Sequence, residues 1–555
     1  MSTIPRSESS LRVWAVAAVC AAALVALVLR LLHSVDVTDE AFYAASAYRF
    51  ALGARPLLDD WSPQQLAALV VSPVVRLHLA IAGDTTGLML TLRFAYLAMM
   101  SAAGAVTWAA LRRVVRPWIA LLAVVATIVL VPFTIPAPSY DTIAIAGVML
   151  GCAGGIGVLT RRDGRPWAAV GGFGFALAAV AYTTVAVAGV VALVWLTWRR
   201  RELILPFVGG ALAVAVPLAI VVVPCLGGLR QTLAYSLAMS GYGGNTSKLL
   251  GIASSASAFL IKQPAFYAVA ACVAWTRWPG RTLPSWVPLS LCPLSVVVFG
   301  VPGTTAALFA AAMLLIASLA WVAWRPVHGD EEDGGRERVA RWVAGIGFVA
   351  GGIFAYTSTN GFMMLGAGGI AVMPALLALA GERFASSPAR ANVAVVLLAL
   401  VAAAGLLPLW SVAYRDAGPL EQTARVTSGP YAGMFTTPST AASVVQMQAD
   451  LRAVVRPGDR LLSYDAMPAP YLMTGAMPAA PMLWTAPVES RDARANAVFM
   501  GYLDQPGHAP TVAVRNDRLT LAESGYYTGA QVDAYVQAHM SLVYLRAEYR
   551  VFAVR

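Results

Sequence analysis

Charged residues and cysteines are scarce in this chain of 555 residues. Only 12% of the residues are charged, whereas a typical soluble globular chain carries ~25%. The five cysteines all lie in or beside apolar runs and form no Cys-x-x-Cys pair. The five histidines are scattered and form no His-Glu-x-x-His motif. These absences argue against a soluble enzyme, a disulfide framework and a zinc centre, and they indicate no cofactor or metal.

Hydrophobic side chains dominate instead, at 59% of the chain with a mean hydropathy of +0.69. The formal net charge is +11, although lysine occurs only as Lys248 and Lys262. The arginines cluster at the ends of apolar runs, so the positive-inside rule explains this charge and we expect no nucleic-acid partner. The excess of arginine and alanine is typical of a GC-rich bacterial genome. We therefore expect a multi-pass protein of a bacterial inner (plasma) membrane, in contact with the lipid bilayer.

Apolar runs long enough to cross a bilayer, about 20 residues, recur over most of the chain. The run 167–198 has arginines at both ends, so it predicts a tight pair of short helices with a turn at 181–186. The other spans are expected at about 13–32, 86–111, 118–135, 142–160, 203–224, 256–276, 284–301, 303–324, 342–358, 361–380 and 391–413. The fold class is thus an α-helical polytopic membrane protein with about thirteen spans. Its N-terminus is expected in the cytoplasm and its C-terminus outside.

Two long segments are too polar to be spans. Residues 33–85 form a first outer loop, in which we expect juxtamembrane helices on the membrane surface. We divide the chain into a transmembrane domain, 1–414, and a small extracytoplasmic α/β domain, 415–555. In the latter we expect helices at "TPSTAASVVQMQADLRAVV" and "TGAQVDAYVQAHM", strands at "DRLLSY" and "TVAVR", and two closing strands in "SLVYLRAEYRVFAVR". The mixed-charge stretch "RPVHGDEEDGGRERVAR" predicts a cytoplasmic linker.

An acidic pair, Asp39 and Glu40, directly follows the first span in "HSVDVTDEAFY". A carboxylate at an apolar boundary is partly desolvated, which raises its proton affinity and suits it to accept a proton from a hydroxyl. Arginines at the same depth can hold an anionic headgroup. A simpler alternative is that Thr38 and Asp39 only cap a surface helix. The neighbouring Asp59 and Asp60 are interpreted as a solvated turn.

These motifs resemble the GT-C superfamily of membrane glycosyltransferases. The resemblance rests on "TDEAFY", "GARPLLDDWSPQQ", "LRFAYLAMMSAAGA", "PSYDTIAIAGVML" and the short helical pair, and it covers roughly residues 13–200. It is closest to the aminoarabinose-transferase and protein-mannosyltransferase branch, whose members take a sugar from a polyprenyl phosphate. It implies a GT-C-like fold, a polyprenyl-phosphate sugar donor, and an envelope glycan, glycolipid or protein as acceptor on the outer face. Some superfamily members use a divalent metal.

The resemblance also implies roles for individual residues. Asp39 is similar in position to the family's catalytic base, Glu40 to its partner, and Asp141 to an acidic residue that orients the acceptor or the base. The implied reaction is a single displacement with inversion, in which Asp39 accepts the proton of the acceptor hydroxyl. Asp141 as a simple helix cap remains an alternative.

The substrate-binding residues are expected from the same motifs and from the outer loops. Gln64 stands where family members often have a basic residue, and "STNGFMM" lacks the Arg-Tyr pair common in this branch. The donor phosphate is therefore expected to contact Arg230, Lys248 or Arg415. The full predicted substrate-binding set is Arg93, Tyr43, Gln64, His78, Arg230 and Lys248. Snorkelling of Arg93 to the surface and interfacial packing of His78 are the alternatives.

Other functional classes remain open from the sequence. A transporter or lipid flippase is the main one, but few charged residues fall at mid-membrane in the expected spans. An O-antigen polymerase or ligase usually has its large loop late in the chain, whereas here the informative loop comes first. A non-catalytic envelope assembly protein with the same fold is the third alternative.

Overall fold

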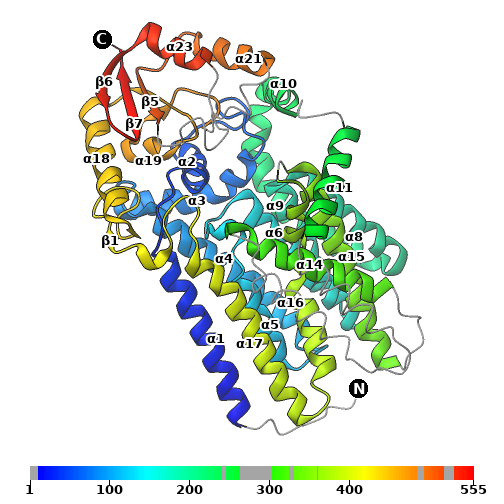
Figure 1. The fold of residues 1–555 in the computed structure, drawn as a ribbon. Helices are drawn as coiled ribbons and strands as arrows, with labels where there is room; N and C mark the ends of the chain where they lie inside the picture. The colour runs from blue at the N-terminus through cyan, green and yellow to red at the C-terminus, as the bar shows by residue number, and fades with distance from the viewer. Residues whose placement is uncertain are drawn as a thin grey trace.

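The structure, a computed structural model, is a helical bundle with a smaller mixed α/β unit at one end (Figure 1). It describes residues 10–240, 245–262, 303–323, 331–358, 360–483, 493–517 and 530–554. The first helix begins at the end of the bundle far from the C-terminal unit, and it runs toward that unit.

Eight helices in the described ranges are long and apolar enough to cross a membrane. They are α1 (Ser10–Leu31), α3 (Gln65–Ala82), α4 (Leu88–Leu111), α6 (Tyr140–Thr160), α9 (Ile204–Val222), α15 (Glu331–Thr357), α16 (Leu365–Phe384) and α17 (Pro388–Ser411). Further apolar helices are α5 (Pro117–Ile128), α7 (Arg165–Ala181), α8 (Ala186–Arg199) and α14 (Ala306–Ala323). The predicted polytopic membrane protein is confirmed. The number of spans stays a prediction, because 284–301 and most of 256–276 lie outside the described residues.

The predicted pair of short helices is confirmed. Helix α7 ends at Ala181, a single 3-10 turn covers Thr183–Val185, and α8 follows at once. Two other expectations differ from the structure. Helix α3, expected on the membrane surface, has the length and composition of a span. The predicted linker is wrong from Glu331 onward, because these residues form the first turns of α15.

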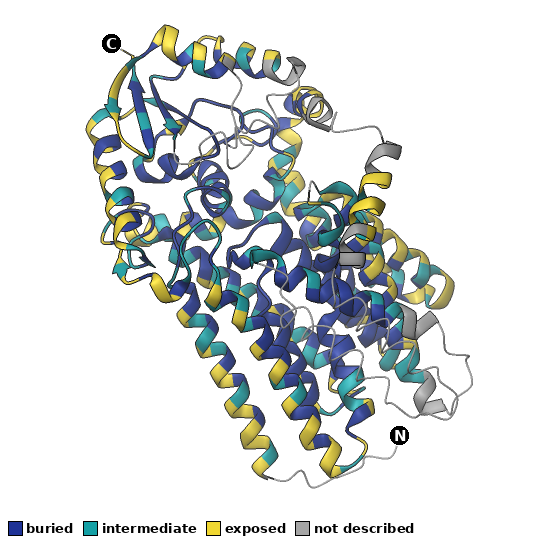
Figure 2. Cartoon of the chain, viewed as in Figure 1, coloured by how far each residue is buried: buried dark blue, intermediate teal, exposed yellow. Residues whose placement is uncertain are grey.

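The interior of the bundle is built around α6 and α16, each 89% buried over its apolar window. Figure 2 shows these helices as buried, while α1 and α17 are exposed along their outer faces. Helix α7 lies directly on α6 because glycines face each other. A Cβ atom on Gly154 would be 2.4 Å from the Cα of Gly171, and one on Gly174 would be 2.5 Å from the amide N of Gly151. Small residues at a crossing allow such close backbone approach in membranes.

The C-terminal unit contains a five-stranded sheet of order β4-β3-β5-β7-β6. Its strands are β3 (Arg460–Tyr464), β4 (Met477–Pro478), β5 (Val512–Asn516), β6 (Ser541–Leu545) and β7 (Tyr549–Ala553). Strand β3 is parallel to β4 and β5, and β7 is antiparallel to β5 and β6. Its helices are α18 (Pro438–Val454), α19 (Ala469–Thr474), α21 (Ala493–Leu503) and α23 (Ala530–His539). The helices and strands predicted here from the sequence are confirmed, including the helix start, where Thr437 caps α18.

This unit is joined to the first loop by backbone pairing. Strand β2 (Phe435–Thr436) pairs with β1 (Ala424–Arg425), and its Phe435 also exchanges hydrogen bonds with the chain after α1. The amide of Ser34 donates to Phe435 O at 2.8 Å, and the amide of Phe435 donates to Leu32 O at 2.7 Å. Helix α2 (Asp39–Ala51) packs between α3 and α19. The C-terminal unit therefore helps to shape the segment that carries the acidic pair.

Candidate functional site

The acidic segment is organised by Asp36, a fully buried side chain. Its carboxylate accepts the amide protons of Thr38 and Glu40, both at 2.8 Å, and so caps α2. Thr38 makes no side-chain cap, so the proposed capping by Thr38 and Asp39 is wrong. Burial raises the pKa of Asp36 to about 7, and the nearby charge of Asp39 adds to the shift. Asp39 is thereby released from a capping role and is available for chemistry.

Asp39 is the more accessible carboxylate of the pair, with 24% of its side chain exposed. Its Oδ2 lies 3.6 Å from a guanidinium nitrogen of Arg415. The phenol of Tyr414 lies near Asp39, and burial together with the charge of this carboxylate raises the pKa of Tyr414. Asp39 thus faces a cation and a hydroxyl supplied by the segment that follows α17.

That segment is held in an unusual backbone conformation. Arg415 has a φ of 53°, which side-chain-bearing residues rarely adopt. The neighbouring Asp416 fixes it in place by accepting the amide proton of Val35 at 2.9 Å and the hydroxyl proton of Thr436 at 2.7 Å. Such conformations persist where surrounding contacts hold them, and they cluster at functional sites. The contacts of Asp416 thus hold the backbone of Arg415 in a strained conformation in which its side chain faces Asp39.

Glu40 and Arg93 form a buried bidentate ion pair beneath this surface. Both N–O distances are 2.6 Å, and the two side chains are 2% and 1% exposed. The remaining Arg93 donors bond to the carbonyls of Leu31, His33 and Ser34. All five N–H groups of Arg93 are thus engaged, and its snorkelling to the surface is wrong. The pair ties α2 and α4 to the end of α1, so its geometry suits positioning rather than contact with a substrate.

Asp141 lies at the start of α6 and is 5% exposed. The cap of α6 is Ser139, which accepts the amide proton of Thr142 at 3.1 Å, so the interpretation of Asp141 as the cap is wrong. Among the described residues, Asp141 Oδ1 has no hydrogen-bond partner. Asp141 also lies within electrostatic reach of Asp39. Two predicted carboxylates from separate parts of the chain are therefore close enough to influence each other's charge.

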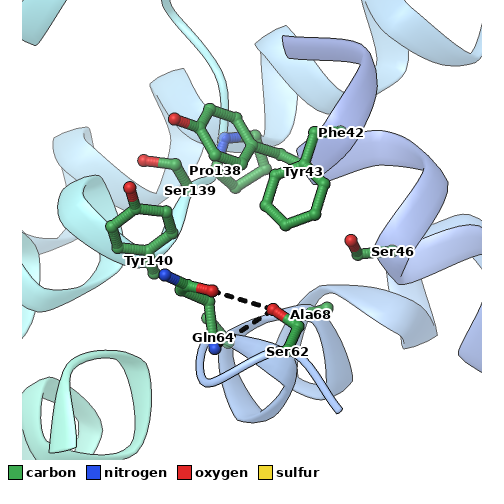
Figure 3. Close-up of a pocket in the computed structure, with 10 residues that line it drawn as sticks. Phe42, Tyr43, Ser46, Ser62, Gln64, Ala68, Pro138, Ser139 and Tyr140 are labelled. Atoms are coloured by element: carbon green, nitrogen blue, oxygen red, sulfur yellow. Dashed lines mark hydrogen bonds between the residues drawn. The ribbon is translucent and has the colours of Figure 1, made fainter. Parts of the chain in front are cut away.

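A small cavity of about 20 Å³ lies between α2, the start of α3 and the start of α6, and its lining includes Tyr140, the residue before Asp141. Figure 3 shows Tyr43 and Tyr140 on one side of it and Gln64 on another. The two tyrosine rings meet edge-on with centroids 5.8 Å apart. Gln64 accepts a hydrogen bond from the Ser62 hydroxyl at 2.8 Å. This volume has room for about one water molecule, so a substrate would need the cavity to open.

Three other predicted substrate-binding residues are His78, Arg230 and Lys248. Within the described residues, none of them lines the small cavity or forms a hydrogen bond or ion pair with Asp39 or Asp141. His78 Nδ1 lies 2.9 Å from the Thr91 hydroxyl and links α3 to α4. Arg230 is exposed at the start of α10 (Leu229–Ser240). Lys248 lies in α11 (Asn245–Lys262), but its side chain is outside the described part. In the described ranges, no group of three His, Cys, Asp or Glu side chains could hold a metal.

The solvated turn predicted at Asp59 and Asp60 is wrong for Asp60, which is 1% exposed. Its Oδ2 lies 4.0 Å from a nitrogen of Arg49, which is also buried. Burial raises the pKa of Asp60, partly offset by the charge of Arg49. The C-terminal unit lies against this turn, since the amide of Trp61, the residue after Asp60, donates to Pro481 O at 2.9 Å.

Sequence reasoning missed Asp36, Tyr140 and Tyr414 as members of the site. Asp36 had a detectable signal, since an aspartate followed by threonine at the second position favours a local turn that can cap a helix. The two tyrosines had none, because only the fold brings the ends of α6 and α17 to the start of α2.

No family model matches the chain, and no curated protein sequence matches it. Solved structures do. The crystal structure of ArnT from Cupriavidus metallidurans in the apo state aligns with a TM-score of 0.51 over 98% of each chain, at 14% identity. The chain has the fold of ArnT. The structure of ArnT from the same organism bound to undecaprenyl phosphate aligns with a TM-score of 0.50 over 97% of each chain, also at 14% identity.

ArnT is an aminoarabinose transferase of GT-C type, so the GT-C fold expected from the sequence motifs is confirmed. The agreement extends over nearly the full length of both chains. The motif resemblance covered only the first two hundred residues, so the ArnT comparison also accounts for the later helices and the C-terminal unit.

Proposed function

We propose that this protein is a glycosyltransferase that moves a sugar from a polyprenyl phosphate to a hydroxyl of an envelope glycan, glycolipid or protein. One observation carries the proposal. In a chain with the ArnT fold, the accessible carboxylate of Asp39 lies opposite Arg415 and close to Asp141. A neighbouring ArnT structure contains undecaprenyl phosphate, which supports a lipid phosphate as the carrier.

The reaction is a single displacement. The acceptor hydroxyl attacks the anomeric carbon while Asp39 accepts the hydroxyl proton. The bond between the anomeric carbon and the phosphate oxygen breaks, the polyprenyl phosphate leaves, and the anomeric configuration inverts. Arg415 stabilises the charge that develops on the leaving phosphate, since a preorganised cation is worth most where negative charge grows. Donor binding draws Arg415 from Asp39 and leaves that carboxylate free to act as base.

The surrounding residues hold the base in place. Asp36 fixes the first turn of α2, and the Glu40–Arg93 pair fixes the same turn from below. Asp141 orients the acceptor hydroxyl from the other side, because its Oδ1 has no protein partner among the described residues. Tyr43 and Gln64 line the cavity that widens to admit the sugar.

We also propose that this site faces the outside of the membrane, together with the C-terminal unit. Arginines gather at the opposite end of the bundle, at Arg112 and Arg113, at Arg161 and Arg162, and at Arg199 to Arg201. The positive-inside rule assigns that end to the cytoplasm. The C-terminal domain, 415–555, then binds or orients the acceptor.

The test is release of free polyprenyl phosphate by the purified protein. Synthetic polyprenyl-phosphate sugars carrying mannose, arabinofuranose, an aminosugar or galactose are supplied with membrane extract as the acceptor source. We expect one donor to be consumed by the wild type. Asp39→Asn should lower the rate by at least about a hundredfold, since positioned general bases contribute 10²–10⁴-fold.

Asp84→Asn is the matched control, because Asp84 is an exposed aspartate at the end of α3. It should retain wild-type activity. A flippase would move the lipid without cleaving it, so unchanged donor with all four sugars would contradict the proposal. Full activity in a folded Asp39→Asn protein would remove Asp39 as the base.

A further inference from the structure

A larger cavity, of about 580 Å³, lies between α6, α8 and α15. It adjoins Val158, near the end of α6 opposite Asp141. Seventeen residues of helix separate these two positions, which corresponds to ~25 Å. The cavity is therefore distinct from the site around Asp39, and its volume is typical of a site for a small ligand.

One end of this cavity is strongly basic. Its lining includes four arginines, Arg199, Arg200, Arg338 and Arg341. Glu202 pairs with Arg200 at 2.6 Å, and Glu337 lies 3.6 Å from Arg341. Arg199 is exposed and pairs with no acidic residue in the described ranges. Arg199 therefore contributes a positive charge that no carboxylate in the described ranges neutralises.

The rest of the lining is aromatic and apolar. Trp195 and Trp342 meet with ring centroids 4.7 Å apart, beside Val191, Ile346 and Val349. The indole Nε1 of Trp342 is buried without a hydrogen-bond partner in the described part of the chain. Tryptophan is enriched where membrane hydrocarbon meets the headgroups. Along the cavity, arginines are followed by tryptophans and then by aliphatic side chains. This order matches the headgroup, interfacial and hydrocarbon layers of a lipid leaflet.

We propose that this cavity, the basic groove, binds an anionic phospholipid. The phosphate of the headgroup lies among the four arginines, and an acyl chain follows Val191 and Val349. Guanidinium groups match phosphate geometry in a bidentate manner and are weakly hydrated, so they suit a partly dry site. Basic pockets between membrane helices are a known form of headgroup recognition. A soluble phosphate would leave the apolar wall uncovered, so the lipid is the better fit.

The experiment is native mass spectrometry of the purified full-length chain with phosphatidylglycerol or phosphatidylcholine added in increasing amounts. We expect preferential retention of phosphatidylglycerol by the wild type. The double variant Arg199→Gln/Arg341→Gln should weaken this retention by roughly 5-fold for each arginine. The matched control is Arg112→Gln/Arg113→Gln, an equal charge change at the end of α4. Those two arginines lie near the same end of the bundle, since their charges act on Arg161, but neither lines the groove.

A second variant tests the groove by its volume and leaves the charge unchanged. A Cβ atom on Gly345, which lines the groove, would meet nothing within 4 Å, so Gly345→Leu is expected to fold and to occupy part of the space. It should also lower phosphatidylglycerol retention. Equal retention of both lipids by the wild type would overturn the proposal, as would equal losses in the groove and control variants. Equally tight binding of glycerol 3-phosphate would assign the groove to a soluble phosphate instead.

Discussion

At the residue scale, the site depends on two aspartates with different surroundings. Asp36 is buried and accepts two backbone amide protons, whereas Asp39 is partly exposed and faces Arg415. The cap holds the helix start and leaves the second carboxylate free. Because the three carboxylates Asp36, Asp39 and Glu40 have different roles, an apolar protein can have all of them within five positions.

A pH-dependent stability is expected from Asp36. Its pKa is about 7 in the folded chain, compared with an ordinary value of 3.8. The folded chain thus binds more protons between these values, so stability falls as the pH rises through this interval. Asp36→Asn keeps an acceptor oxygen and removes the titration. The difference in Tm between pH 5 and pH 8, measured by tryptophan fluorescence, should be smaller in this variant.

The exposed Asp84 again supplies the control. Its pKa lies below the ordinary value because the amide of Thr86 donates to it, so it stays ionised from pH 5 to 8. Asp84→Asn should retain the wild-type difference in Tm. If Asp36→Asn retains it as well, Asp36 does not titrate in this range.

The buried pair of Glu40 and Arg93 is expected to be structural. Glu40→Leu or Arg93→Met leaves one buried group uncompensated, which costs about 3–5 kcal/mol. The double variant Glu40→Leu/Arg93→Met removes both charges and should regain much of this loss. Unfolding in denaturing detergent measures all three. Additive losses in the double variant would show that the two side chains do not act as a pair.

Residues of this kind set the limit of prediction from sequence. The position of Asp39 after the first span was enough to single it out. The engagement of Arg93 was not predictable, because Glu40 lies 53 positions away and the three carbonyls belong to the last residue of α1 and to the chain just after it. The burial of Asp60 depends in the same way on Pro481, in a different part of the chain.

At the scale of elements, the α6–α7 crossing holds the second carboxylate in place. Asp141 is set by the start of α6, and α6 is set by its glycine contact with α7. Hydropathy and arginine positions were enough to predict α7, α8 and the turn between them. The apolar runs alone did not indicate which helices are innermost, since burial depends on packing as well as hydropathy.

A bulky side chain at this crossing is expected to disrupt the bundle. Gly174→Leu would place a Cβ atom 2.5 Å from the backbone of Gly151, so the helices must separate. Overpacking typically costs 1–3 kcal/mol, and here the obstacle is backbone. We expect loss of the monodisperse peak in size-exclusion chromatography. Gly209→Leu, on the exposed face of α9 where a Cβ meets nothing within 4 Å, should elute like the wild type. Identical profiles for the two variants would contradict this account of the crossing.

At the scale of the whole molecule, the membrane helices and the C-terminal unit form the site together. Tyr431 donates its phenolic proton to the Asp36 carbonyl at 2.7 Å, and Phe435 pairs with the chain after α1. The sequence predicted the helices and strands of the C-terminal unit. It did not predict the docking of this unit on the first loop, because the contacts join residues about 400 positions apart.

The central claim is that the chain consumes a polyprenyl-phosphate sugar. The most direct measurement is mass spectrometry of lipid extracts from a strain that lacks the gene. The account predicts accumulation of one polyprenyl-phosphate-linked sugar, which a wild-type copy clears and Asp39→Asn does not. An unchanged lipid profile, or clearance by Asp39→Asn equal to that by the wild type, would contradict it.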